Sequence, residues 1–461
     1  MNDLSQTFRD AVILARQMLI RYLWIDSLCI IQDSADDWRA ESSKMGEYYM
    51  NALFNIAAVS SSDGSAGCFM ARDALPLTPC PISIRFPEGT PEASSQVFIR
   101  PSVGWDPVNE IVGFQRPPLW RRAWVVQERL LSPRTLQFSS MQMSWKCRMG
   151  EGSERVPETS KIYEGGAGDK LFQETLFGLK KFNAKSKVPS LDDRLSIGFG
   201  TKDELLDLYN AWYDLVTLYG KCLLTQPSDI FPAIAGIARV IALSISDRYI
   251  CGLWLHDLHR GLLWSAPDST ASKPDLRHIR APSWSWASLR GTCGFYVRQI
   301  SQRDVEVKTD MFMIEGSGER TSGTDTFGGF GSVEEVVLGV RGKVKKAHPS
   351  GLDNDEVFQG IQKGSETLFD LGVKRTVGYY FPDNADRRYL TKIWCMPVMT
   401  EQRMNFGSLE TAARPVEATQ ARCLALLRLS QDRNIYMRVG SAWIIDYSWF
   451  DGVEMSSFSL I

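Results

Sequence analysis

The chain has 461 residues, a formal net charge of -2, and 44% hydrophobic against 23% charged residues. Its length predicts two or more hydrophobic cores, and its composition is typical of a globular protein. The near-zero charge disfavours binding to nucleic acid or anionic lipid. No stretch reaches the roughly 18 uninterrupted apolar residues that a membrane-spanning helix needs, and the nine scattered cysteines fit neither a disulfide framework nor a zinc site. We expect a cytoplasmic protein without a membrane span, metal or resident cofactor.

The first 150 residues alternate between predicted helices and strands. Apolar side chains at near-helical spacing predict a helix over residues 6 to 19, and "YLWID" (22 to 26) predicts a short buried strand. Ser34 is a candidate N-cap for a second helix that ends near Asn51, and "FNIAAVS" is a second strand candidate. This alternation predicts an α/β domain over residues 1–150 with a mostly parallel sheet.

The later chain changes character twice. "PPLWRRAWVVQERLL" predicts a helix that begins at proline, "RTLQFSSMQMSWKCR" predicts two strands, and "GEGSERVPETS" predicts a flexible connection. Residues 151–280 are mainly helical in pattern, so we expect them to pack on the α/β domain. Residues 281–461 are rich in short β-branched and aromatic stretches, which predict a β-rich region with a flexible loop near 316–331.

Three motifs carry a family resemblance: "YLWIDSLCIIQDSADDW", "WRRAWVVQERLLSPRTLQF" and "APSWSWASLRG". They resemble the fungal HET (heterokaryon incompatibility) domain family, which implies a TIR-like α/β fold and a role in fungal non-self recognition leading to growth arrest or cell death. Some TIR domains cleave NAD with a glutamate, so the resemblance also implies NAD as a possible substrate, by fold analogy alone. Family members usually carry a "SY.WG"-like strand upstream, and nothing like it precedes Asp10 here. Either the sequence is an abbreviated version or its start was chosen too late; if the missing strand lines the family's functional pocket, we expect a weakened or altered activity.

Asp26 is a candidate site residue because it ends the predicted strand. Open α/β sheets place their ligand crevices at the carboxyl ends of strands. A carboxylate in apolar surroundings is costly unless it is paired or hydrogen-bonded, so Asp26 either caps the next helix or lines a pocket. Cys29 is a candidate nucleophile, although a free cysteine is commonly a small buried apolar residue.

Glu128 is the leading catalytic candidate, because it lies one turn after Trp124. Apolar surroundings would raise its pKa toward a value useful in acid/base chemistry. The alternative is a structural ion pair with Arg122, Arg129 or Arg134. Arg122, Trp124 and Gln127 are candidates for binding a polar ligand, as are Gln32 and Trp286, which come from the other two motifs.

The histidines all lie beyond residue 255, which leaves the α/β segment without one. A Cys/His or Ser/His pair would need a partner from the later region, so carboxylate chemistry is favoured. His256 and His259 are three residues apart but lack a visible third metal ligand. Trp284 and Trp286 would share one side of an extended segment, either as a docking surface against the α/β part or as a ligand groove.

Three hypotheses for the function follow from these residues. The chain is a HET-type incompatibility effector that hydrolyses a nucleotide such as NAD or signals by association, a non-catalytic interaction module of the same pathway, or an enzyme recruited to fungal secondary metabolism on the same scaffold. Its ligands would be a small molecule or nucleotide, and its partners another protein or a second copy.

Overall fold

The structure is a computed structural model that divides into two compact units, Met1–Lys187 and Val188–Ile461. We describe each unit by itself. The residues described are 3–72, 80–85, 94–99, 117–147, 150–154, 202–245, 247–266, 281–289, 291–295, 305–314, 336–353, 365–372, 375–383, 390–405, 416–430 and 432–461.

Serine side chains cap two of the described helices of the first unit, Ser5 at α1 (Gln6–Gln17) and Ser34 at α3 (Ala35–Asn51). The other helical elements are α2 (Asp26–Cys29), the 3-10 turn η2 (Pro118–Arg121) and α5 (Val125–Leu131). Ser34 accepts the Asp37 N–H at 3.2 Å, which confirms the N-cap of α3, and the helix ends at Asn51 as expected. The helix predicted from proline 117 onward is interrupted, because Arg122 has an extended backbone between η2 and α5.

The four-stranded sheet of the first unit is mixed. Its order is β1 (Asn55–Ala58), β4 (Arg134–Phe138), β5 (Met143–Cys147) and β6 (Gly150–Ser153). β1 and β4 pair in parallel, whereas β4–β5 and β5–β6 are antiparallel. A mostly parallel, TIR-like sheet is therefore not confirmed by these strands, and β6 occupies the start of the expected flexible connection. A separate hairpin pairs β2 (Cys80–Arg85) with β3 (Ser94–Ile99).

The prediction of a buried strand at "YLWID" is wrong. Residues 20–25 form neither helix nor strand, and the side chain of Tyr22 is 81% exposed. Leu19 ends the preceding turn in the left-handed region (φ 57°), and no described strand pairs with the segment that follows. A strand needs such a partner for its backbone N–H and C=O groups, which local apolarity cannot supply.

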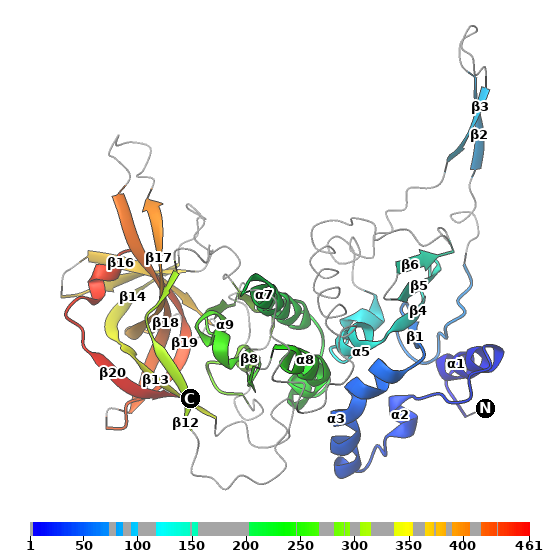
Figure 1. The fold of residues 1–461 in the computed structure, drawn as a ribbon, viewed down its shortest axis with the longest axis horizontal. Helices are drawn as coiled ribbons and strands as arrows, with labels where there is room; N and C mark the ends of the chain where they lie inside the picture. The colour runs from blue at the N-terminus through cyan, green and yellow to red at the C-terminus, as the bar shows by residue number, and fades with distance from the viewer. Residues whose placement is uncertain are drawn as a thin grey trace. The chain divides into compact units, whose positions relative to one another are not determined.

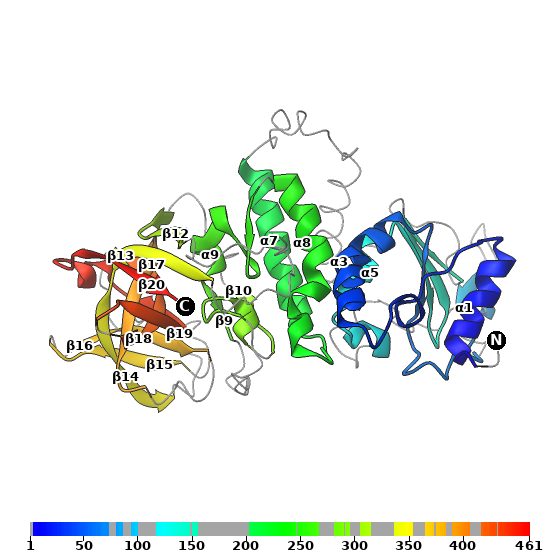
Figure 2. The same cartoon turned by 90° about the horizontal axis from the view of Figure 1, so that it is seen from below.

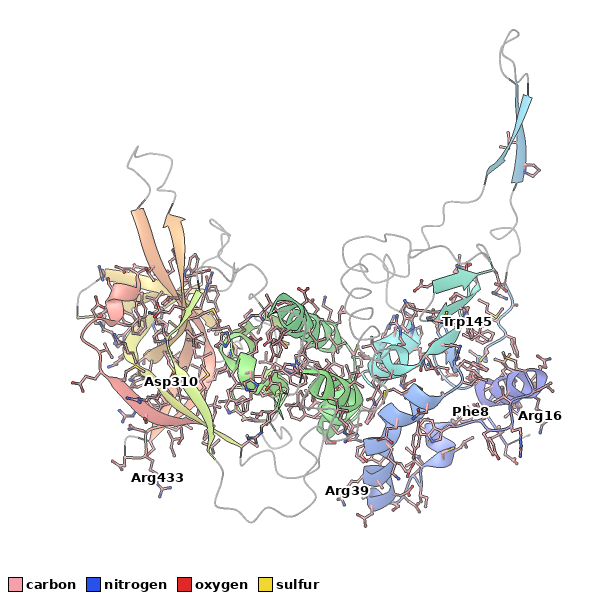
Figure 3. All side chains as sticks on the ribbon, viewed as in Figure 1. Phe8, Arg16, Arg39, Trp145, Asp310 and Arg433 are labelled. Carbon is pink, nitrogen blue, oxygen red and sulfur yellow. The ribbon has the colours of Figure 1, made fainter. Side chains whose placement is uncertain are left out.

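The core of the first unit joins η2 and α5 to the sheet. Ala57 and Val59 pack with Trp120 and Val125 in one buried cluster, and α5 also contacts α3. Figures 1 and 2 show α5 and α1 on opposite sides of the sheet. Arg16 of α1 and Arg39 of α3 are exposed and project outward (Figure 3). The helices α3 and α5, which are far apart in the sequence, therefore lie side by side in the first unit.

In the helical part of the second unit, two tryptophan side chains donate hydrogen bonds to the same backbone carbonyl. Its elements are α7 (Lys202–Tyr219), η4 (Pro227–Ile230), α8 (Pro232–Ile245), β7 (Tyr249–Ile250), β8 (Leu253–Trp254), η5 (Leu255–Asp257), α9 (Leu258–Gly261), β9 (Trp264–Ser265), η6 (Trp286–Ser288) and β10 (Gly294–Phe295). The indoles of Trp212 and Trp286 both donate to the Gly252 carbonyl, at 3.0 and 2.9 Å. Trp286 also packs edge-on against Tyr219 and Phe231.

The β-rich region, which confirms the strand prediction past residue 281, contains a closed ring of strands. The strands are β11 (Val305–Val307), β12 (Asp310–Ile314), β13 (Val337–Lys343), β14 (Lys345–Asp353), β15 (Glu366–Asp370), β16 (Arg375–Pro382), β17 (Ile393–Asn405), β18 (Val416–Ser430), β19 (Ile435–Ile444) and β20 (Met455–Leu460). Antiparallel pairs run β17–β14–β15–β16–β19–β18 and back to β17 (Figure 2). Small residues such as Ala421, Cys423 and Ala425 fill its core, together with Trp449 and Phe450 from η11 (Tyr447–Phe450).

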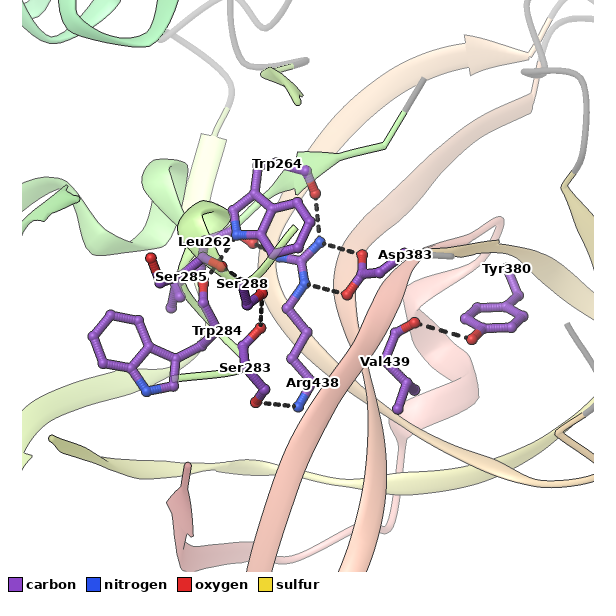
Figure 4. Close-up of polar contacts among 10 residues, drawn as sticks. All are labelled: Leu262, Trp264, Ser283, Trp284, Ser285, Ser288, Tyr380, Asp383, Arg438 and Val439. Carbon is purple, nitrogen blue, oxygen red and sulfur yellow. Dashed lines mark hydrogen bonds and ion pairs between the residues drawn. The ribbon is translucent and has the colours of Figure 1, made fainter. Parts of the chain in front are cut away.

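A buried arginine joins the ring of strands to the helical part (Figure 4). Arg438 of β19 is 0% exposed and binds Asp383 through Nε and Nη2, at 3.1 and 3.0 Å. Its guanidinium also donates to the carbonyls of Leu262 and Trp264 and lies 3.4 Å from the centre of the Trp264 indole. Every face of the charge is thus occupied by a carboxylate, carbonyl or ring, which is the condition for burying it.

The structure of the second unit bears on two predictions from the sequence, one about Trp284 and Trp286 and one about the helical segment. Trp284 and Trp286 do not share an extended segment, because Trp286 begins the short helix η6, and both are buried within the second unit. The helices α7 and α8 confirm the helical pattern after residue 202, and they belong to the second unit. Their packing on the first domain stays a prediction, and the loop predicted at 316–331 lies outside the described residues.

Candidate functional site

Glu128 lies in the middle of α5, on the side of the helix that faces α3. The helix is short, and its backbone is held at the far end by Ser132, whose hydroxyl donates to the Glu128 carbonyl at 2.6 Å. Glu128 as a residue is partly exposed, whereas its carboxyl group is buried deeply enough for burial to change its pKa.

The electrostatic surroundings of Glu128 bring the predicted site residues together. Burial raises the pKa of its carboxyl from 4.5 to about 7. The Arg122 guanidinium lowers this pKa, the Asp26 carboxylate raises it, and the Tyr49 phenol lowers it. The predicted effect of apolar surroundings on Glu128 is thus present, and Asp26 and Arg122 are both near enough to act on it.

Tyr49 is the residue that the sequence reasoning did not select. It lies in α3, and the charges of Glu128 and Asp26 act on its phenol. Burial, and then the charges of Glu128 and Asp26, raise the pKa of the phenol well above 10, so it remains a donor at neutral pH. The only sequence signal was its position on the face of α3 that carries Met45 and Ala52.

Asp26 begins α2 instead of ending a strand. Its carboxylate accepts the N–H of Ser27 at 2.7 Å and is partly buried. A negative charge in the first turn of a helix is favourable. The N-cap of α2 is nevertheless Ile25, with no side-chain cap, and Ser34 caps α3, so Asp26 does not cap either helix. The same carboxylate acts electrostatically on both Glu128 and Tyr49, which places it at the candidate site as well.

The arginines near Glu128 in sequence have different partners. Arg129 lies 4.1 Å from the centre of the Trp120 ring, and Arg134 donates to the Leu53 carbonyl at 3.2 Å. Arg122 is exposed, and its charge acts on both Glu128 and Tyr49. Of the three arginines proposed as structural partners, Arg122 is therefore the one beside the carboxyl, with its guanidinium open to an anionic ligand.

Aromatic side chains flank this group of residues. Trp24 packs against Tyr49, with ring centres 5.9 Å apart in an edge-to-face arrangement. Trp124, the residue before α5, packs edge-to-face on Trp38 with ring centres 6.3 Å apart. Gln127 is only 1% exposed, which favours a packing role over contact with a ligand.

Cys29 and Gln32 lie in the turn after Asp26. Cys29 is exposed at the end of α2. Gln32 donates its amide N–H to the carbonyls of Ile30 and Asp26, at 2.9 and 3.4 Å, so it holds the backbone of this turn. Both are near Asp26 in sequence, and neither has a described contact with Glu128.

Trp286 and the histidines belong to the second unit. Trp286 is buried there, with its indole N–H on the Gly252 carbonyl. His256 contacts Asp247 at 2.7 Å, and His259 lies 3.8 Å from Asp257. The part of the chain that the structure describes holds no group of three His, Cys, Asp or Glu residues that would bind a metal ion. Within the same residues, no helix is long and apolar enough to cross a membrane.

Comparison with known families identifies the part of the chain that carries this site. Residues 1–128 match the family described as Heterokaryon incompatibility protein (HET). The N-terminal part of the chain is thus similar to the HET domain. The matched HET residues include Asp26, Tyr49, Arg122 and Glu128. No curated protein and no solved structure matches the chain.

Proposed function

We propose that the HET domain acts in fungal non-self recognition by hydrolysing a nucleotide, with NAD as the candidate substrate. One observation carries the proposal: the pKa of Glu128 is raised to about 7, by burial and also by the Asp26 carboxylate, which comes from a separate motif. Such a value suits a group that must exchange a proton near neutral pH. Perturbed carboxyls of this kind are concentrated at functional sites.

The chemistry would be the cleavage of an N-glycosidic bond by water. As the bond to nicotinamide breaks, its electron pair leaves with the neutral ring, and positive charge develops on the ribose. The ionised Glu128 carboxylate would stabilise that charge and accept the proton of the attacking water, and Asp26 would add negative charge. ADP-ribose, nicotinamide and one proton are the products.

The ligand-binding groups have the complementary character. The exposed guanidinium of Arg122 supplies a positive charge for a phosphate group. Trp24 lies against Tyr49 and offers an aromatic surface beside the carboxyls. The positive charge suits an anionic ligand and the aromatic surface suits a flat ring, and a nucleotide has both features.

The test is the release of nicotinamide from NAD by the purified full chain. We expect release by the native sequence and loss of at least a hundredfold in Glu128→Gln, with the fold retained. Glu47→Gln is a matched control, because Glu47 is an exposed glutamate of α3. No release by the native chain, or equal release by Glu128→Gln, would refute the proposal.

A second candidate, signalling by self-association, is favoured by exposed apolar side chains around α2. Leu19 is 88% exposed, and Tyr22, Leu28 and Ile31 are more than half exposed. Such groups are a cost in water unless another surface covers them. Sedimentation over a range of concentrations tests this candidate. We expect the native chain to self-associate and Tyr22→Glu to prevent the association. A native chain that is monomeric at all concentrations would exclude this candidate.

A further inference from the structure

A buried aspartate of the second unit binds an exposed histidine. The side chain of Asp247, between α8 and β7, is 1% exposed, and its Oδ1 lies 2.7 Å from Nδ1 of His256 in η5. The carboxylate also accepts the Tyr209 hydroxyl at 2.8 Å and the Arg248 N–H at 2.7 Å. Burial, and then the bond to Asp247, raise the pKa of the Tyr209 phenol, so the phenol stays a donor. Two groups besides the imidazole therefore hold this carboxylate in place.

The contact fixes which ring nitrogen of His256 carries the hydrogen. A carboxylate only accepts, so Nδ1 is the protonated nitrogen of the neutral ring, and Nε2 keeps the lone pair. The His256 side chain is 71% exposed. Because Nδ1 faces the buried carboxylate, the edge of the ring that carries Nε2 is the one open to solvent. The carboxylate also stabilises the positive charge that the ring acquires when Nε2 forms a bond.

The other histidines in the described part of the chain lack this combination. Nε2 of His259, not Nδ1, lies toward a carboxylate, 3.8 Å from Asp257, and burial lowers the pKa of this imidazole to about 4. Nδ1 of His348 lies 3.0 Å from the backbone carbonyl of Thr391, which is neutral. His256 is thus the described histidine that has a carboxylate behind Nδ1 and solvent before Nε2.

The surroundings of His256 favour an anionic group carried by another molecule. Arg248 is exposed, and its backbone carbonyl accepts the N–H of Leu255, the residue before His256, at 3.0 Å. This backbone pair places an arginine beside the segment of the histidine, and a guanidinium suits the oxygens of a phosphoryl group. A ring so exposed can be reached by a donor in solution, whereas it is not enclosed as catalysis on a small bound substrate requires.

We propose that His256 is a phosphoryl acceptor, with Nε2 as the nucleophile, Asp247 as the positioning residue behind it, and a compound with a reactive phosphoryl group as the donor. Nε2 forms a bond to phosphorus while the bond from phosphorus to the leaving group breaks, and the electron pair of that bond departs with the leaving group. The ring keeps its hydrogen on Nδ1, and the Asp247 carboxylate balances the resulting positive charge. This modification is independent of the nucleotide hydrolysis proposed for the first unit.

The test is to incubate the full chain with phosphoramidate, whose leaving group is ammonia, and to locate the phosphoryl group by peptide mass mapping without acid. We expect His256 to be labelled at least about tenfold faster than His348, the matched histidine with a neutral acceptor on Nδ1. His256→Gln should remove the fast label and leave the rate at His348 unchanged. Equal rates at the two histidines, or no label on His256, would overturn the proposal.

Asp247→Asn tests the carboxylate. Loss of its charge should slow the labelling of His256 about tenfold and leave His348 unaffected. Nitrogen-15 spectra should show the neutral His256 ring with its hydrogen on Nδ1 in the native chain, and a larger share on Nε2 in the variant. An unchanged rate, or a native ring protonated mainly on Nε2, would overturn the proposal. The comparison of His256 with His348 in the native chain decides the case in which Asp247→Asn does not fold.

Discussion

Burial of the Glu128 carboxylate lowers the stability of the fold at neutral pH, and the raised pKa that results suits proton transfer. Its pKa in the folded chain is about 7, above the ordinary 4.5, so the folded state binds the proton more tightly than the unfolded state does. The contribution of Glu128 to folding is therefore greatest below pH 4.5 and falls as the pH rises through about 7. Groups of this kind persist where function requires them.

The first prediction follows from that sign. Glu128→Gln removes the cost of burying the charge, so we expect it to be more stable than the native chain at pH 8, by up to about 3 kcal/mol. At pH 4 the two should be nearly equal. Denaturant unfolding at both pH values measures this, with Glu47→Gln as control. A variant that is less stable at pH 8 would show that Glu128 holds the fold as an ion-pair partner.

The second prediction separates the two charges beside Glu128. Asp26→Asn removes a negative charge, so the Glu128 titration should move to lower pH. Arg122→Gln removes a positive charge, so it should move to higher pH. Carboxyl NMR of both variants checks the signs, and shifts in the same direction would mean that one of these residues is remote from Glu128.

At the scale of elements, what the sequence predicts depends on whether the cause is local. The cap at Ser34, the end of α3 and strands β1, β4 and β5 follow from side chains within a few residues of each element. The strand expected at "YLWID" failed because pairing depends on a distant partner. The mixed direction of the sheet is equally non-local, and so is the contact between α3 and α5, which are far apart in the sequence.

The third prediction concerns the turn between β7 and β8. Gly252 has φ 91°, and a Cβ there would meet the Trp286 indole, whose N–H bonds the Gly252 carbonyl. We expect Gly252→Ala to destabilise the second unit by several kcal/mol. Gly452→Ala, with φ 74° and open space around the Cβ, should cost only the backbone strain of about 1–2 kcal/mol. Thermal unfolding of the two variants compares them, and equal losses would mean that the indole can move aside.

At the scale of the whole molecule, the candidate site and the buried arginine lie in different units. The site is built within Met1–Lys187, and the Arg438–Asp383 pair lies within Val188–Ile461. Sequence motifs located the site residues in the first unit, but Trp286 comes from a motif that serves the core of the second. A family resemblance reports which residues matter without saying whether they bind a ligand or hold the fold.

The fourth prediction uses this division. Arg438→Met leaves Asp383 charged and buried without its partner, which should cost the second unit about 3–5 kcal/mol. The titration of Glu128 should be unaffected. Calorimetry together with carboxyl NMR measures both, with the exposed Arg433→Met as control. A change in the Glu128 titration would show that the two units are energetically coupled.

The pH dependence of nicotinamide release is the most direct measurement of the central claim. If Glu128 acts in its ionised form, kcat/KM for NAD should rise with pH around an apparent pKa of about 7, and Asp26→Asn should move that rise to lower pH. A rate that is flat between pH 6 and 8, or one whose rise is the same in Asp26→Asn, would contradict the assignment of Glu128 as the group that ionises in catalysis.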